Sequence, residues 1–428
     1  MEKGEEVPVI SYKEVLDKIE DQENHLLIGN GFNYGLGIDT SYLSIFQKMK
    51  EEKRGVFKDA ISLVEECSFD LEKFIGRLEA DISPNNSFLR KYVSNKVKLD
   101  FMKATHEIVK SEIRNIYAEK NEGIHLLLQN FTNYFSLNYD SFLYLLLLKY
   151  KPVQNDGKNA IILQSSIKFI EEDFNENQSN IYQDIKEARE KGKLEINFSD
   201  ESTPVKRPFS KLTKIHFSTE VKEYSKTNNK GWKSKDIDRV VKTIFEEEHR
   251  NRVLKRVDDG SRQLQLFGNN TEFEFDVNSK TQNLFFLHGA FHIYKEGQSI
   301  KKITQQSDKP LYNRLEEILN NEGQEIVCIF QNENKLDLIN RNEYLIKCHK
   351  KLGELNGNMV IIGSSLADND NHIFDQINNS EIDTIYISTQ LKSKEKNYQS
   401  ANDKFPSKKI HLFDTETISY KLPDEHVV

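Results

Sequence analysis

Four short motifs directly follow apolar runs of strand length, and they constrain the fold more than any other feature. They are Gly29-Asn30-Gly31-Phe32-Asn33, Ser136-Leu137-Asn138-Tyr139-Asp140, Leu287-His288-Gly289 and Gly363-Ser364-Ser365-Leu366. In an open parallel sheet, ligands bind in a crevice outside the carboxyl ends of the strands. We therefore expect the four motifs to meet at one dinucleotide site, although they are spread over most of the chain.

Apolar runs alternate with helical patterns on both sides of a polar middle region, which predicts a parallel α/β sheet. Apolar residues at helical spacing indicate three or four helices between Tyr42 and Gln129, which we expect to cover the sheet. Strands are predicted at 25–28, 131–137, 283–287, 326–330, 359–362, 384–387 and 410–413.

The middle region is rich in Asn, Lys and Glu and has few long apolar runs. It contains a helical pattern at 237–257 and an alternating, hairpin-like pattern at 263–277. We expect residues 1–150, with their helical module, and residues 283–428 to form one core. Residues 151–282 are then a polar α+β insertion, suited to regulation or to docking a partner.

Composition excludes several classes of protein. The net charge of −8 argues against broad binding of nucleic acid, which needs a positive field. Three cysteines without a C-x-x-C pair exclude a disulfide scaffold and the usual structural zinc patterns, so we expect a cytoplasmic protein. The most apolar stretch, 142–148, is far shorter than the roughly 20 residues of a membrane span.

The first and last motifs contain small residues that let the backbone approach a ligand. Exposed N–H groups from Gly29 to Phe32 could bind a pyrophosphate without a lysine, although an ordinary strand-to-helix turn has the same residues. Ser364 and Ser365 could donate to a phosphate or a ribose. The alternative for this loop is helix capping by its acidic and amide residues, Asp368, Asn369 and Asp370.

The two central motifs supply the side chains that suit chemistry. Asn138 can donate and accept hydrogen bonds to a ribose or to an ordered water, whereas Asp140 is better suited to capping the helix that follows. His288 ends a very apolar strand and could be a general base, or a hydrogen-bonded core histidine. His292 raises the possibility of a metal, but no acidic or cysteine partner stands at ligand spacing.

In this order the motifs resemble the NAD-binding core of the sirtuin superfamily. Asn138 and Asp140 match its Thr-Gln-Asn-x-Asp box, His288 its catalytic Leu-His-Gly motif, and Gly363-Ser364-Ser365 its Gly-Thr-Ser loop. The resemblance covers roughly residues 23–150 and 282–415 and implies a Rossmann-like, mostly parallel sheet with flanking helices. It implies that Asn138 and His288 are catalytic and that NAD+ contacts Gly29, Asn30, Gly31, Phe32, Asn33, Asp140, Gly363, Ser364 and Ser365.

Several features of sirtuin deacylases are missing. The chain cannot build their four-cysteine zinc module, Tyr34-Gly35-Leu36-Gly37-Ile38 replaces their Gly-Ile-Pro segment, and Ser388 stands where an Asn usually follows the late strand. These departures resemble the sirtuin-like effectors of bacterial anti-phage defence, which hydrolyse NAD+ and starve the infected cell. The implied protein is a metal-independent NAD+ glycohydrolase that stays latent until it is activated.

The implied reaction releases nicotinamide and leaves ADP-ribose, with His288 as base and Asn138 orienting the ribose or the attacking water. The alternative is a sensor that binds NAD or ADP-ribose without cleaving it, or a subunit of a defence complex. Because a toxic enzyme needs an off-state, we expect a homo-oligomer, an activating regulatory subunit, or both. We expect no nucleic-acid or membrane partner.

Overall fold

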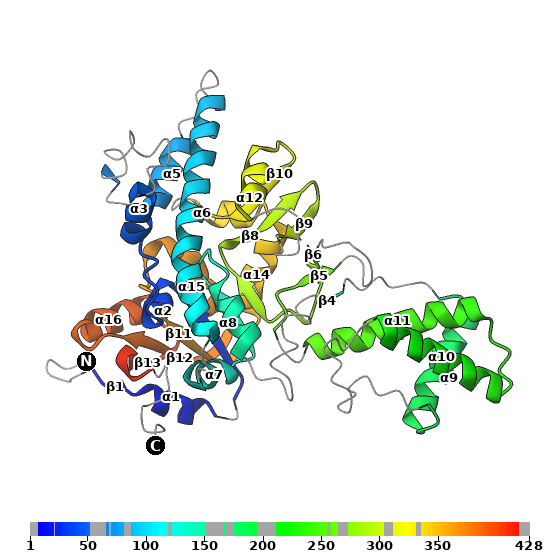
Figure 1. Cartoon of the computed structure of the whole chain (residues 1–428). Helices are drawn as coiled ribbons and strands as arrows, with labels where there is room; N and C mark the ends of the chain where they lie inside the picture. Colours follow the sequence, from blue (N-terminus) through cyan, green and yellow to red (C-terminus); the bar gives the residue numbers. More distant parts are fainter. Residues whose placement is uncertain are drawn as a thin grey trace. The chain divides into compact units, whose positions relative to one another are not determined.

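The computed structural model divides the chain into two compact units, Met1–Lys151 with Asn283–Val428, and Pro152–Gln282 (Figure 1). The polar middle region of the sequence forms the second unit. The residues described are 7–20, 22–51, 66–67, 70–80, 87–118, 122–150, 166–167, 174–194, 211–254, 257–263, 273–303, 311–330 and 335–418. Within these ranges, every helix is too short or too polar to cross a membrane.

A seven-stranded, all-parallel sheet is the centre of the first unit. Both faces of such a sheet are covered by helices, which explains the continuous apolar runs of its central strands. The strand order is β1-β13-β12-β11-β2-β3-β7. The bounds are β1 Val9–Ile10, β2 Asn24–Ile28, β3 Asn133–Ser136, β7 Leu284–Phe286, β11 Asn356–Ile362, β12 Glu381–Thr389 and β13 Lys409–Asp414.

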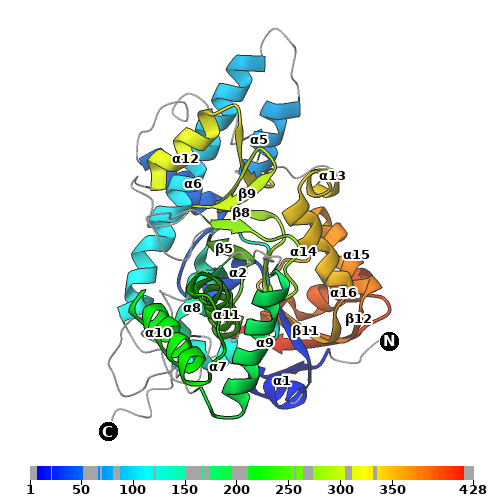
Figure 2. The same ribbon diagram turned by 90° about the vertical axis from the view of Figure 1, so that its right-hand side faces the viewer.

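Without the short edge strand β1, this is the 3-2-1-4-5-6 order of a Rossmann-like fold, and it reverses between β2 and β11. The expected α/β class and the expected strands at both sides of the reversal are therefore confirmed. Helices α14, α15 and α16 pack side by side as one layer (Figure 2). The helices of this unit outside the cavity wall are α1 Tyr12–Ile19, α7 Glu122–Gln129, α8 Phe142–Tyr150, α14 Glu343–Gly353, α15 Asn371–Asn379 and α16 Lys394–Lys404.

One predicted strand belongs to a different sheet. The apolar run at 326–330 gives β10, Gln324–Cys328, which pairs antiparallel with β8, Gly289–Glu296, instead of joining the parallel sheet. β8 in turn forms a hairpin with β9, Ser299–Lys302. The sequence pattern marks an apolar strand but does not say which sheet it joins.

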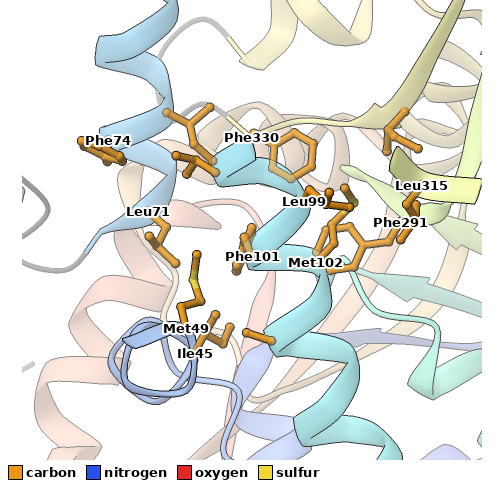
Figure 3. Close-up of a cluster of buried hydrophobic side chains, with 14 of the residues drawn as sticks. Ile45, Met49, Leu71, Phe74, Leu99, Phe101, Met102, Phe291, Leu315 and Phe330 are labelled. Carbon is orange, nitrogen blue, oxygen red and sulfur yellow. The ribbon is translucent and has the colours of Figure 1, made fainter. Parts of the chain in front are cut away.

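The helices predicted before Gln129 exist, but three of them do not lie on the parallel sheet. α3 Tyr42–Glu51, α5 Leu71–Ala80 and α6 Ser87–Ala118 pack on one another, on α12 Leu311–Asn320 and on the β8–β10 strands. Figure 3 shows their shared core, in which Phe101 of α6 lies among apolar side chains from several of these elements. These helices therefore form a module of their own.

The second unit has a separate core between α9 Glu176–Glu190, α10 Lys211–Thr227 and α11 Ser234–Leu254. Its centre includes Phe217 and Val240, both fully buried. Three short strands complete it, β4 Ser166–Ile167, β5 Ser261–Gln263 and β6 Phe273–Phe275. β5 and β6 are antiparallel; the alternating pattern at 263–277 contains β6 and the last residue of β5, and residues 264–272 lie outside the described ranges.

Candidate functional site

The turns after β2 and β11 are locked together at the point where the strand order reverses. The N–H of Gly29 donates to the carbonyl of Ile362 at 2.9 Å, and the N–H of Gly31 donates to the carbonyl of Gly363 at 2.9 Å. Gly363 has φ +73°, and a Cβ there would lie 2.1 Å from the nitrogen of Phe32. Glycine is required because the two backbones touch, with no space for a side chain.

This packing corrects the expected pyrophosphate cradle. The N–H groups of Gly29 and Gly31 are used between the two turns, and the N–H of Phe32 donates to the carbonyl of Gly29 at 3.0 Å. Phe32 and Asn33 are fully buried and do not line the cavity. The glycine-rich segment begins the short helix α2, Asn30–Gly35, is hydrogen-bonded to the end of β11 and the residue after it, and lines part of the site.

Amide and carboxyl side chains hold this segment in place by hydrogen bonds. Asn33 donates from Nδ2 to Asp140 Oδ2 at 3.1 Å, and Asn138 donates from Nδ2 to the carbonyl of Gly29 at 3.4 Å. Asp140 also accepts from the N–H of Phe142, the first residue of α8, at 2.7 Å, but Ser141 is at the N-cap position, because its carbonyl accepts the first helical bond. Burial raises the pKa of Asp140.

A cavity of about 480 Å³ brings residues from all four motifs together. Its sheet side is formed by the motif residues that line it: Gly29, Asn30, Gly31, Leu137, Asn138, Tyr139, Asp140, His288, Gly363, Ser364 and Ser365. Its other side comes from the helical module and from α13, Lys335–Ile339. Every candidate residue except Phe32 and Asn33 therefore lines this cavity, and the roles of all of them stay predictions.

His288 is 2% exposed and sits on the turn between β7 and β8. Burial, together with the nearby charge of Lys335, lowers the pKa of this imidazole well below its ordinary value. Its Nε2 has no hydrogen-bond partner among the described residues, and Asp370 Oδ1 lies 3.5 Å from it. At neutral pH the ring is neutral and Nε2 is available as an acceptor.

Three charged residues lie on the same cavity, and the sequence pattern singled out only one of them, Asp370, as a helix cap. The ammonium of Lys335 lies 3.1 Å from Asp370 Oδ1 and 3.6 Å from Glu72 Oε2. Burial raises the pKa of Glu72, while Lys335 and the hydroxyls of Tyr42 and Tyr139 oppose that rise. Only proximity in the fold identifies this group, because its members stand far apart in the chain.

Asp370, which follows the last motif, is one of the residues expected to cap a helix. Asp370 stands at the N-cap of α15, but within the described chain its side chain makes no capping hydrogen bond and pairs with Lys335 instead. Ser364 accepts from the N–H of Leu366 at 3.2 Å, and Ser388 accepts from the N–H of Gly363 at 3.0 Å. These bonds hold the loop in place at the cavity edge.

His292 lies outside the cavity and packs between the rings of Tyr144 and Phe286. Its ring centroid is 6.2 Å from that of Tyr144 and 5.0 Å from that of Phe286. Across the described ranges, no three His, Cys, Asp or Glu side chains are grouped so as to hold a metal ion.

Comparison with known proteins adds one match. Residues 234–420 match a protein-family model described as a domain of unknown function (DUF4917). The match covers less than half of the chain, including parts of both units and two of the four motifs. No curated protein matches the sequence.

Proposed function

We propose that the chain hydrolyses NAD+ to ADP-ribose and nicotinamide at the cavity described above. The observation that carries the proposal is the position of His288 and Asn138 on one cavity at the strand-order reversal. Rossmann-like folds bind dinucleotides at this reversal. A volume of about 480 Å³ lies in the range of small-molecule sites, about 300–1,000 Å³.

The reaction breaks the bond between the ribose C1′ and the pyridinium nitrogen. The bonding electron pair goes to nicotinamide, which leaves as a neutral molecule, and the transition state has oxocarbenium character. Water then forms the new C1′–O bond and releases one proton. The unpartnered Nε2 of His288 is the acceptor for that proton, or for a ribose hydroxyl proton, and Asn138 orients the ribose or the water.

The charges around the cavity support a cationic substrate. Two carboxylates, Glu72 and Asp370, share the single ammonium of Lys335. When both carboxylates are ionised, this group has a net charge of −1. Such fixed charge stabilises a positively charged transition state more strongly in a buried site than in water.

The test is nicotinamide release from NAD+ by the purified chain, beside His288→Ala and Asn138→Ala. A general base contributes about 10²–10⁴-fold, so each variant should lose at least about 100-fold in rate. His411→Ala is the matched control, because His411 lies on β13 and stacks on Tyr386 away from the cavity lining. Release that survives both substitutions would overturn the catalytic assignment.

A second function is binding of NAD or ADP-ribose as a sensor, without cleavage. The bonds from Asn138 to Gly29 and from Asn33 to Asp140 favour a rigid binding surface, which a sensor also needs. Calorimetry combined with the release assay separates the two functions, because a sensor binds NAD+ and releases no nicotinamide. Absence of any binding would overturn both.

The proposal extends to a role in bacterial anti-phage defence, with activity held back until a second copy or a regulatory subunit binds. That part is supported by the sequence resemblance to sirtuin-like effectors. The absence of a metal requirement is proposed on the same resemblance. Release of nicotinamide in the presence of a chelator is the corresponding measurement.

A further inference from the structure

One wall of the cavity is aromatic and surrounds a buried carboxylate. Tyr42, Phe101 and Tyr139 line it together with Glu72. The ring centroids of Tyr42 and Phe101 are 6.3 Å apart, and those of Phe101 and Tyr139 are 6.2 Å apart. Aromatic faces attract cations, and a carboxylate beside them adds a full negative charge.

The carboxylate of Glu72 is fixed in position and only partly satisfied. The hydroxyls of Tyr42 and Tyr139 both donate to its Oε1. Its Oε2 is buried and accepts no hydrogen bond from any described residue, while the side chain is 3% exposed and lines the cavity. A buried acceptor without a hydrogen bond lowers the stability of the protein, unless a bound ligand donates to it.

With both carboxylates ionised, the neighbouring charges leave this wall negative. Lys335 lies 3.6 Å from Glu72 Oε2 but closer to Asp370, at 3.1 Å, so one ammonium serves two carboxylates. A buried charge that is not fully compensated lowers the stability of the folded protein. A structural role alone would be met by apolar residues in the same space.

Another part of the cavity lining has different chemistry. Ser364 and Ser365, which have hydroxyl side chains, line it there beside Gly363, whose N–H and carbonyl are bonded to Ser388 and Gly31. His288 lies beside the aromatic wall, with its ring centroid 6.4 Å from that of Tyr139. The cavity thus combines an aromatic, acidic part suited to a flat cation with a serine-bearing loop suited to hydroxyls and phosphates, and His288 lies next to the first part.

We propose that Glu72, between Tyr42 and Tyr139, recognises the positively charged nicotinamide ring of NAD+ and distinguishes it from the neutral ring of NADH. This inference rests on the proposed function. NAD+ is then oriented with its nicotinamide against the helical module and its adenosine half along the Gly363 loop. The bond to be broken then lies close to His288.

The test compares the binding of carba-NAD+, which has the cationic ring but resists hydrolysis, with that of NADH. The wild type should bind carba-NAD+ at least about tenfold more tightly than NADH, because a charge pair near a protein surface contributes that much or more. Glu72→Gln keeps the shape and removes the charge, so the preference should fall to about one. Glu79→Gln is the matched control, since Glu79 is on the same helix and pairs with Lys98.

Tyr42→Phe provides a second variant that keeps the carboxylate but removes one of its two donors. It should reduce the preference for carba-NAD+ in the same direction, by less than Glu72→Gln does. An unchanged preference in Glu72→Gln, with nicotinamide release still measurable in the wild type, would overturn the inference and leave the hydrolase proposal standing. Failure of the wild type to bind either dinucleotide would overturn both.

Discussion

Replacing His288 by Gln should change how the stability of the protein depends on pH. In the unfolded chain this histidine titrates near its ordinary pKa of 6.5, whereas burial and Lys335 keep it neutral in the folded protein at lower pH. Unfolding in mild acid therefore takes up a proton at His288. Acidification stabilises the unfolded state, so this contribution to stability is present above pH 6.5 and is lost as the pH falls.

The size of the effect follows from proton linkage. For a histidine that stays neutral in the folded state, lowering the pH from about 6 to about 5 removes about 1 kcal/mol from the free energy of unfolding. His288→Gln has no such contribution. The difference in stability between the wild type and the variant should therefore shrink by about 1 kcal/mol over that interval, whatever its value at neutral pH.

Urea denaturation followed by circular dichroism at both pH values measures this difference, with the transition of the first unit fitted separately. His372 provides an internal check, because burial lowers its pKa to about 3 and its replacement by Gln should give a change of similar size. A stability difference for His288→Gln that is the same at both pH values would refute the buried, neutral imidazole on which the mechanism depends.

Three further predictions concern the packing and the charges. Gly37→Ala should lower the free energy of unfolding by about 1–2 kcal/mol, since Gly37 has φ +80° and open space around it. Gly363→Ala should lower it by at least about 3 kcal/mol, because the added Cβ would meet the backbone of the neighbouring segment. The midpoints of urea denaturation measure both changes. Lys335→Met should raise the pKa of His288, measured by NMR titration, because the ammonium opposes protonation of the ring. Phe217→Ala should destabilise the second unit by about 3–5 kcal/mol, seen as faster proteolysis there with unchanged NAD+ binding.

Local patterns in the sequence were sufficient for the parallel strands. The runs before Gly29 and Gly363 are continuously apolar because helices cover both faces of the sheet, and such runs can be recognised without the fold. The run at 326–330 is equally apolar but pairs with β8 instead. The choice between two sheets depends on partners distant in the chain, which periodicity does not reveal.

The same distinction applies to the candidate site. Asn138 and His288 could be singled out because each is a polar residue directly after an apolar strand. The N–H groups of Gly29 and Gly31 could not be assigned in the same way, because their partners are the last residue of β11 and the residue after it. Whether such a turn faces a ligand or another segment of backbone is decided by packing.

The sequence by itself determined the strand ends and the polar residues placed there, since both follow from local alternation between apolar and polar positions. Only the tertiary structure decided which charges meet. Glu72, Lys335 and Asp370 come from three separate elements, and no pattern in the sequence indicates that they meet. Their burial on one cavity results from docking the helical module over the sheet edge, and Coulomb interactions depend on that distance, not on separation along the chain.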